Sequence, residues 1–244
     1  MNDLTGAIGT WTSLSDPTVA EIAAGSFDFV VVDTEHTALG LETVADCLRA
    51  VDAGGSDAVV RVPWNDPVRI KRLLDLGPDG LLVPMVDDAE AAREAVAATR
   101  YPPEGIRGLA AARAADYGRE FESYVRETHR DLTLVPQIET EAGVEHVETI
   151  AATEGVDALF VGPADLSAAL GVFAEWTHPT LAEAIGTVLD AGDDAGVPVG
   201  TLGTTPEQIR SLGSFGFDYM VAGADFAHLL EGGKQALDAA ESVL

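Results

Sequence analysis

The chain has 244 residues, 47% of them hydrophobic, and carries a formal net charge of −27 at pH 7. This length suits a single α/β barrel of about 250 residues with a substantial core. So acidic a surface makes nucleic acid and anionic membranes poor partners. No segment has the length or apolarity of a membrane span.

Cys47 is the only cysteine, which excludes an internal disulfide. The N-terminal segment lacks the basic and apolar regions of a signal peptide, so we expect a cytoplasmic protein. The acids are scattered along the chain, and the only lysines are Lys71 and Lys234. This pattern favours a halophilic protein from a high-salt cytoplasm, where salt screens the self-repulsion.

Apolar runs alternate with stretches of helical spacing throughout the chain, and no linker or composition break divides residues 1–244, which we expect to form one domain. Several runs are continuously apolar, as in strands covered on both faces. Eight such units predict a (β/α)₈ barrel, with a doubly wound open sheet as the rival. The predicted strands are Leu4–Trp11, Phe27–Asp33, Ala58–Val62, Gly80–Pro84, Leu132–Ile138, Ala158–Val161, Val197–Leu202 and Phe217–Ala222.

The clearest helical patterns start at turn or capping signals, including Asp66-Pro67 and Thr205-Pro206. They cover Leu41–Val51, Val68–Leu76, Ala89–Ala98 and Leu181–Ala191.

Glu139 and Asp165 each follow one of two successive predicted strands. Paired parallel strands lie about 5 Å apart, so the two carboxylates should converge at the C-terminal ends of the barrel strands, where this fold places its chemistry. Like charges held so close need a proton or a cation between them, and a hard divalent ion suits oxygen ligands. The alternative is that each acid only favours the first turn of a helix.

Other polar residues follow the predicted strands in the same way. The segments DTEH, VRVPWNDPVRIKRLLDLGPDGLLVPMV, ATRYPPEGIRG, VPQIET and TEGVDALFVGPADLS, which lie between Trp11 and Leu170, resemble the HpcH/HpaI aldolase family of metal-dependent pyruvate-type aldolases. The resemblance implies a (β/α)₈ barrel with a swapped C-terminal helix, a homohexamer or trimer, and Mg²⁺ or Mn²⁺, with Co²⁺ as a further option. It also implies reversible cleavage of a 4-hydroxy-2-oxo acid or 2-keto-3-deoxy sugar acid to pyruvate and an aldehyde.

The resemblance assigns Glu139 and Asp165 as metal ligands, with Gln137 supporting them by a hydrogen bond. Arg61 would contact the keto oxygen and stabilise the enolate that forms on cleavage. The alternative for Arg61 is a structural ion pair with a neighbouring acid, because an unpaired cation at a strand end is costly.

His36 is the candidate base, and Asp33 would orient its imidazole, although a lone loop histidine is usually just solvated. Asp75 matches a family acid that reaches into a neighbouring subunit's site, and its alternative is a solvated helix face.

Two further features complete the predicted site. The turn Gly162-Pro163-Ala164 opens a helix whose free amides would hold the substrate carboxylate. Trp11 would wall the pocket, with aromatic core packing as the alternative.

Other functions remain open on the residues alone. A Schiff-base aldolase would need a lysine near a strand end, which neither lysine provides. A CoA-thioester lyase would need a basic nucleotide-binding patch. Glycine-bearing turns after the last two strands resemble phosphate sites of isomerase barrels. A non-catalytic binding protein would not need His36, Arg61 and the acid pair together.

The charge of the chain generates one prediction. We expect its melting temperature, followed by circular dichroism, to rise between low and molar KCl because salt screens the repulsion among the acids. A melting temperature that is unchanged or lower in molar KCl contradicts adaptation to high salt.

Overall fold

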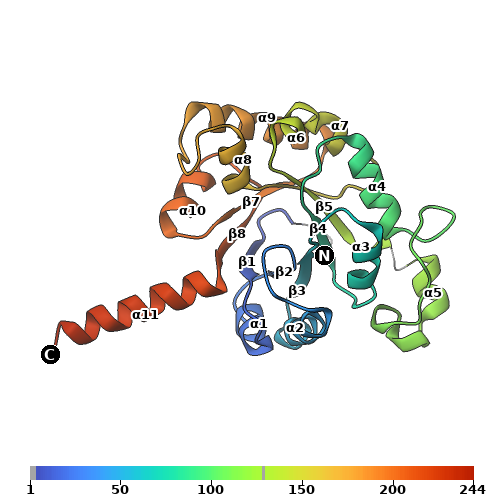
Figure 1. Cartoon of the computed structure of the whole chain (residues 1–244), viewed down its shortest axis with the longest axis horizontal. Helices are drawn as coiled ribbons and strands as arrows, with labels where there is room; N and C mark the ends of the chain where they lie inside the picture. Colours follow the sequence, from blue (N-terminus) through green and yellow to red (C-terminus); the bar gives the residue numbers. More distant parts are fainter. Residues whose placement is uncertain (1–3, 128–129) are drawn as a thin grey trace.

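The computed structural model describes residues 4–127 and 130–244, so the first three residues of the N-terminal segment lie outside it. Eight parallel strands form a closed barrel in the order β1 to β8 (Figure 1). The predicted (β/α)₈ barrel is confirmed, and the open sheet is excluded. The strands are β1 (Ile8–Thr12), β2 (Phe29–Asp33), β3 (Asp57–Arg61), β4 (Gly80–Val83), β5 (Thr133–Ile138), β6 (Leu159–Val161), β7 (Val199–Gly203) and β8 (Tyr219–Ala224).

Helices follow the strands around the barrel, and the two capping signals are confirmed. The side chain of Asp66 accepts a hydrogen bond from the backbone of Arg69, and Thr205 accepts one from Gln208. The helices are α1 (Pro17–Ala24), α2 (Leu41–Gly54), α3 (Pro67–Leu74), α4 (Ala89–Thr99), the 3₁₀ helix η1 (Arg113–Gly118), α5 (Phe121–Arg126), α6 (Glu141–Glu145), α7 (Val147–Ala151), α8 (Pro163–Ala169), α9 (Pro179–Ala195), α10 (Pro206–Gly213) and α11 (Asp225–Glu241).

The first strand begins later than the apolar run predicted. Gly6 adopts a left-handed backbone with φ 80°, so a turn separates Leu4 from β1. Leu4 is nevertheless buried, and it belongs to the cluster of side chains inside the barrel. The apolar character of Leu4 therefore reflects its burial and not its membership of the strand.

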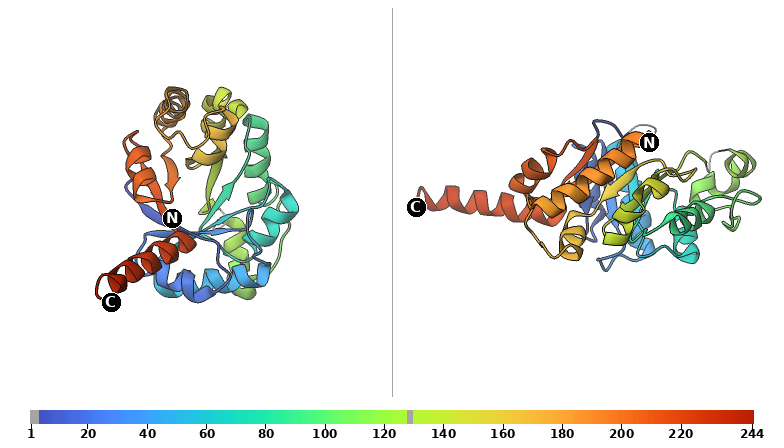
Figure 2. Two further views of the ribbon diagram at one scale, coloured as in Figure 1. Left: turned by 60° about the vertical axis from the view of Figure 1, so that its left-hand side comes forward. Right: turned by 90° about the horizontal axis from the view of Figure 1, so that it is seen from above.

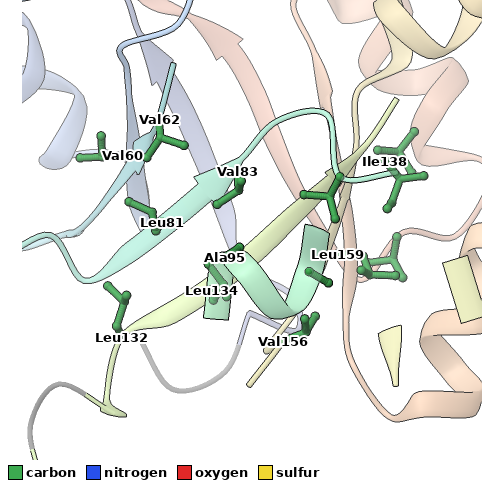
Figure 3. Packing of buried hydrophobic residues seen from close by; sticks show 14 of the residues in the cluster. Val60, Val62, Leu81, Val83, Ala95, Leu132, Leu134, Ile138, Val156 and Leu159 are labelled. Carbon is green, nitrogen blue, oxygen red and sulfur yellow. The ribbon is translucent and has the colours of Figure 1, made fainter. Parts of the chain in front are cut away.

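Two hydrophobic clusters divide the core. The larger lies between the strands and the helices and includes Leu81, Leu134 and Ile138 (Figure 3). The smaller fills the barrel and includes Val31, Val59, Leu82, Val135 and Phe160.

The cluster inside the barrel determines which strand-end side chains face the same way. Successive strand side chains alternate between faces, so residues two positions beyond an inward one also face inward. Asp33, Arg61 and Gln137 stand in this relation to Val31, Val59 and Val135. Each of these inward stacks thus ends in a polar group at the C-terminal end of its strand.

The last helix departs from the compact arrangement. The ribbon of α11 projects away from the barrel and ends at the C-terminus (Figures 1 and 2). Within residues 4–127 and 130–244, no helix is both long and apolar enough to cross a membrane.

Candidate active site at the C-terminal ends of the strands

Arg61, the last residue of β3, is buried with 7% of its surface exposed and is held by two acids. Its Nε and Nη2 donate to the two carboxylate oxygens of Asp33 at 2.8 Å each. Its Nη1 lies 2.7 Å from the carboxylate of Glu35. Because bidentate, charge-assisted bonds match the planar guanidinium, they offset the cost of burying its charge.

Trp11 supports the same guanidinium from its face. The Cζ of Arg61 lies 4.6 Å from the centroid of the Trp11 ring, within the range of a cation–π contact. Trp11 is 5% exposed and packs on Phe160, with 6.1 Å between the ring centroids. The structure therefore places Trp11 in the core inside the barrel, against the face of the guanidinium, while its role as a pocket wall remains a prediction.

Asp33 and His36 do not form the pair expected from the sequence. The carboxylate of Asp33 is occupied by Arg61 and by the backbone N–H of Glu35, at 3.0 Å. The side chain of His36 is 71% exposed, and its Nε2 lies 3.9 Å from Glu35. The physical reason is that the buried guanidinium offers Asp33 two charge-assisted bonds, which an exposed imidazole does not match.

Thr34 ties the loop after β2 to β3. The Thr34 hydroxyl donates to the carbonyl oxygen of Arg61 at 2.6 Å. Its backbone N–H donates to the same oxygen at 3.0 Å. The threonine therefore adds a bond between the two strand ends that carry the Asp33–Arg61 pair.

Glu139, directly after β5, is 4% exposed, and each of its carboxylate oxygens accepts a hydrogen bond. Oε1 accepts from the backbone of Met85 at 2.8 Å, and Oε2 accepts from the side-chain amide of Gln137. Burial first, and then the charges of Asp165 and Glu35, together raise the pKa of Glu139 to about 7, against the lowering effect of these two hydrogen bonds.

Asp165 lies in the first turn of α8, the helix that follows β6, and its charge raises the pKa of Glu139. It is exposed, in contrast to Glu139. The close approach of the two elements depends on Gly162, because a Cβ at this position would lie 2.8 Å from the Oε2 of Glu139. Pro163 then begins the helix, so Gly162, Pro163 and Ala164 form the helix start predicted from the sequence.

The donor set at this position fits a hard divalent cation. Glu139 and Asp165 supply carboxylates of like charge from paired strands β5 and β6. The buried Oε1 of Gln137 has no hydrogen-bond partner in the described part of the chain. No cluster of three or more His, Cys, Asp or Glu suited to a metal occurs among residues 4–127 and 130–244. Two protein carboxylates leave coordination positions open for a substrate's oxygens.

Asp75 stands apart from these residues within one chain. It is the C-cap of α3, and its carboxylate lies 3.4 Å from the Nη2 of Arg107. Arg107 is buried, and its Cζ lies 4.7 and 5.6 Å from the ring centroids of Tyr101 and Tyr124. The structure thus pairs Asp75 with an arginine of its own chain, while its reach into a neighbouring site remains a prediction.

Sequence reasoning missed Glu35 and Met85. Glu35 lies inside the DTEH segment, and its position two residues past a strand end was the available signal. Burial raises its pKa, against the attraction of Arg61. Met85 carries no sequence signal, because its contribution is a backbone N–H in a left-handed conformation with φ 55°.

Comparison with known proteins defines the class to which this barrel belongs. A family model described as HpcH/HpaI aldolase/citrate lyase matches residues 7–231. The chain belongs to this family, as the sequence motifs predicted, and it is an aldehyde-lyase enzyme. Membership of this family supports the interpretation of the sequence as a lyase, and it disfavours the phosphosugar isomerase and the non-catalytic binding protein.

Individual relatives show how similar the chain is to particular members of the family and to known structures. The chain is 41% identical over 219 residues to a 5-keto-4-deoxy-D-glucarate aldolase of Shigella dysenteriae serotype 1 (strain Sd197), covering 89% of this chain and 86% of the relative. The solved HpcH/HpaI aldolase/citrate lyase family protein from Burkholderia cenocepacia J2315 superposes with a TM-score of 0.91 at 38% identity, covering 96% and 94% of the two chains. A citrate lyase beta subunit from M. tuberculosis, solved with oxaloacetate and magnesium, shares the fold at 17% identity and a TM-score of 0.60, covering 91% and 93%.

The raised pKa of Glu139 generates a second prediction. Between its usual 4.5 and about 7, the folded chain binds more protons at Glu139 than the unfolded chain does. In EDTA the free energy of unfolding should therefore fall as pH rises through this window, by at most about 3 kcal/mol from this group. In Glu139→Gln this loss is absent, so the variant gains stability relative to wild type towards pH ~8.

Urea denaturation at several pH values measures the difference. Glu141→Gln is the matched control, because Glu141 is exposed in the next helix, α6. Parallel pH profiles for wild type, Glu139→Gln and Glu141→Gln contradict the assignment.

Proposed function

We propose that this enzyme reversibly cleaves a 2-keto-3-deoxy sugar diacid of the 5-keto-4-deoxy-D-glucarate type. Such a molecule has a keto group beside one carboxylate, then a methylene carbon, then a carbon that bears a hydroxyl. Breaking the bond between the methylene and the hydroxyl-bearing carbon yields pyruvate and an aldehyde. The 41% identity to an aldolase named for this substrate supports the choice.

The observation that carries the proposal is the buried carboxylate of Glu139 beside Asp165. These two residues would hold a divalent cation, Mg²⁺ or Mn²⁺, with Co²⁺ as a further option, and Gln137 would orient Glu139 through the hydrogen bond to its Oε2. The bound cation would supply a Lewis acid for the keto and carboxylate oxygens of the substrate.

Arg61 would act where negative charge develops. As the carbon–carbon bond breaks, its electron pair moves onto the keto oxygen and forms the enolate of pyruvate. Asp33 pairs with the edge of the guanidinium formed by Nε and Nη2, and Glu35 pairs with Nη1. One N–H on Nη1 and one on Nη2 are left to donate to the keto oxygen. A donor fixed in place before the reaction stabilises the enolate without reorganisation.

His36 would accept the proton of the substrate hydroxyl, which lets the aldehyde carbonyl form as the bond breaks. Its exposure at the end of β2 supports this role, because the imidazole is accessible to a substrate entering from solvent. The proton then returns to the methylene carbon of the enolate and completes pyruvate.

At the start of α8, where Gly162, Pro163 and Ala164 lie, the backbone N–H of Ala164 would donate to the substrate carboxylate, because Pro163 has no N–H and that of Gly162 donates to the carbonyl oxygen of Ile138 at 3.1 Å. Their position supports this, since Gly162 lies directly against Glu139 and Gln137. The two lysines lie elsewhere, Lys71 on α3 and Lys234 on the projecting α11, which argues against a Schiff-base mechanism.

A coupled assay tests the function. Pyruvate release from a panel of 2-keto-3-deoxy acids, followed with lactate dehydrogenase in molar KCl, should be fastest with the six-carbon diacid. It should stop in excess EDTA and return with Mn²⁺ or Mg²⁺. Arg61→Lys should lower kcat by roughly 10²–10³-fold, as loss of one oxyanion donor does elsewhere.

Arg69→Lys is the control, because Arg69 lies on the outer helix α3. Full activity in EDTA, or trapping of a pyruvate adduct by borohydride, overturns the metal-dependent mechanism. Activity confined to a CoA thioester overturns the substrate class and favours the lyase alternative.

We also propose a homo-oligomer, a trimer or hexamer, assembled through α11. This helix of 17 residues leaves the barrel and exposes apolar side chains on one face. Phe226, Leu229, Leu230 and Leu237 are 44%, 62%, 73% and 58% exposed. A projecting helix is marginal without tertiary contacts, so a second copy of the chain would cover this face, as in a swapped helix. In such an assembly Asp75 would approach a neighbouring site.

Light scattering after size-exclusion chromatography tests the assembly. Leu230→Lys should shift the mass towards the 25.4 kDa monomer, because it places a charge in the apolar face. Gln235→Lys, on the same helix, should keep the wild-type mass. A monomeric wild-type protein in molar KCl contradicts the proposal.

We further propose a cytoplasmic location. The single cysteine of the chain, Cys47, is buried, and burial raises the pKa of the thiol to about 11. A reduced, unreactive cysteine is compatible with that compartment.

A further inference from the structure

Asp225 is a buried acid that joins the last helix to the first strand. It is the first residue of α11 and is 5% exposed. Its Oδ2 accepts hydrogen bonds from the hydroxyl of Thr12 at 2.7 Å and from the backbone of Ser13 and Leu14 at 2.9 and 2.8 Å. Its Oδ1 accepts from the backbone of Phe226 at 2.8 Å. Four donors thus compensate the burial of one carboxylate.

These bonds act where the pairing of β1 with β8 becomes irregular. Gly9 pairs with Val221, but the register shifts before Trp11, which pairs with Ala224. The regular ladder therefore does not fix the end of β1 on this side. Instead, the carboxylate of Asp225, which directly follows Ala224, accepts hydrogen bonds from Thr12 and Ser13, the two residues that follow Trp11.

Trp11 is the residue that this anchor holds in place. It precedes Thr12, which is fully buried, and its ring lies 4.6 Å from the Cζ of Arg61. Asp33 holds the edge of that guanidinium, whereas Trp11 holds its face. The tilt of the Arg61 plane therefore depends on where β1 ends.

We propose that Asp225 is a positioning residue of the active site, which acts through Thr12 and Trp11 to set the orientation of Arg61. The inference rests on the proposed role of Arg61 at the enolate oxygen. An alternative is that Asp225 only stabilises the start of α11, in which case its loss would change stability but not the surroundings of Trp11.

The experiment uses a full-length background, Trp64→Phe with Trp176→Phe, in which Trp11 is the only tryptophan. Into it are placed Asp225→Asn, which turns an amide towards backbone donors, and Thr12→Val, which removes a single donor. Asp238→Asn is the control, with the same charge change at an exposed position of α11. Thr12→Ser keeps the hydroxyl and serves as the conservative variant.

Without substrate, Asp225→Asn and Thr12→Val should shift the Trp11 emission to the red and increase its quenching by acrylamide. With substrate, kcat/KM should fall roughly tenfold to a hundredfold, the range expected when a catalytic group is displaced by up to about 1 Å. The loss should lie mainly in kcat, because the charge on the keto oxygen develops in the transition state. Thr12→Ser should restore the emission, and Asp238→Asn should change neither property.

Unchanged Trp11 emission and quenching in both variants overturn the proposal. So does a loss of thermal stability with kcat/KM intact. Thr12→Val provides the answer if Asp225→Asn does not fold, since it leaves the carboxylate and three of its donors in place. Because fluorescence needs no substrate, absence of aldolase activity in the parent would refute the proposed function while leaving the anchoring of Trp11 separately tested.

Discussion

A buried guanidinium at the mouth of the barrel organises the strand ends around it. Arg61 is an interior position by the alternation of β3, so its charge is desolvated and must be compensated locally. Asp33 and Glu35 meet it along its edges, and Trp11 meets its face. Three separate strands and one loop are thereby held in a single arrangement, and the loop after β2 that carries His36 is fixed as a consequence.

A second constraint lies after β5 and β6, where the buried Glu139 experiences the like charge of Asp165 and the hydrogen bonds described for it come from neutral groups. Three features accommodate this arrangement: the backbone N–H of Met85, the absence of a Cβ at Gly162, and the side-chain amide of Gln137. The acid cluster and the arginine cluster influence each other, since the charge of Glu35 raises the pKa of Glu139. Neutralisation by a cation at the acid pair would therefore also be felt at the Arg61 network.

The sequence predicted the barrel because its strands are continuous apolar runs, as buried parallel strands require. It also predicted Arg61, Glu139 and Asp165 as site candidates, because each lies at the end of such a run or shortly after it. It did not predict that Asp33 and Glu35 would both pair with Arg61, because these pairings depend on distances between strands. The expected Asp33–His36 contact failed for this reason.

The remaining features had no pattern to detect. The first strand was drawn too early because an apolar residue such as Leu4 can be buried without pairing. Asp225 resembles any acid in a first helical turn, and only the fold brings it to the end of β1. Met85 contributes its backbone N–H, and the residue type gives no indication of such a role.

The backbone and the side chain of Met85 have separate roles. The N–H of Met85 serves Glu139 from a left-handed conformation, while its side chain is 36% exposed at the rim of the barrel. Branching at the β-carbon is poorly tolerated in this conformation, so valine, isoleucine and threonine are disfavoured there. Unbranched residues of different length can exchange more freely. Sequence drift at this position can thus change the exposed surface beyond the end of β4 while leaving the hydrogen bond to the carboxylate of Glu139 in place.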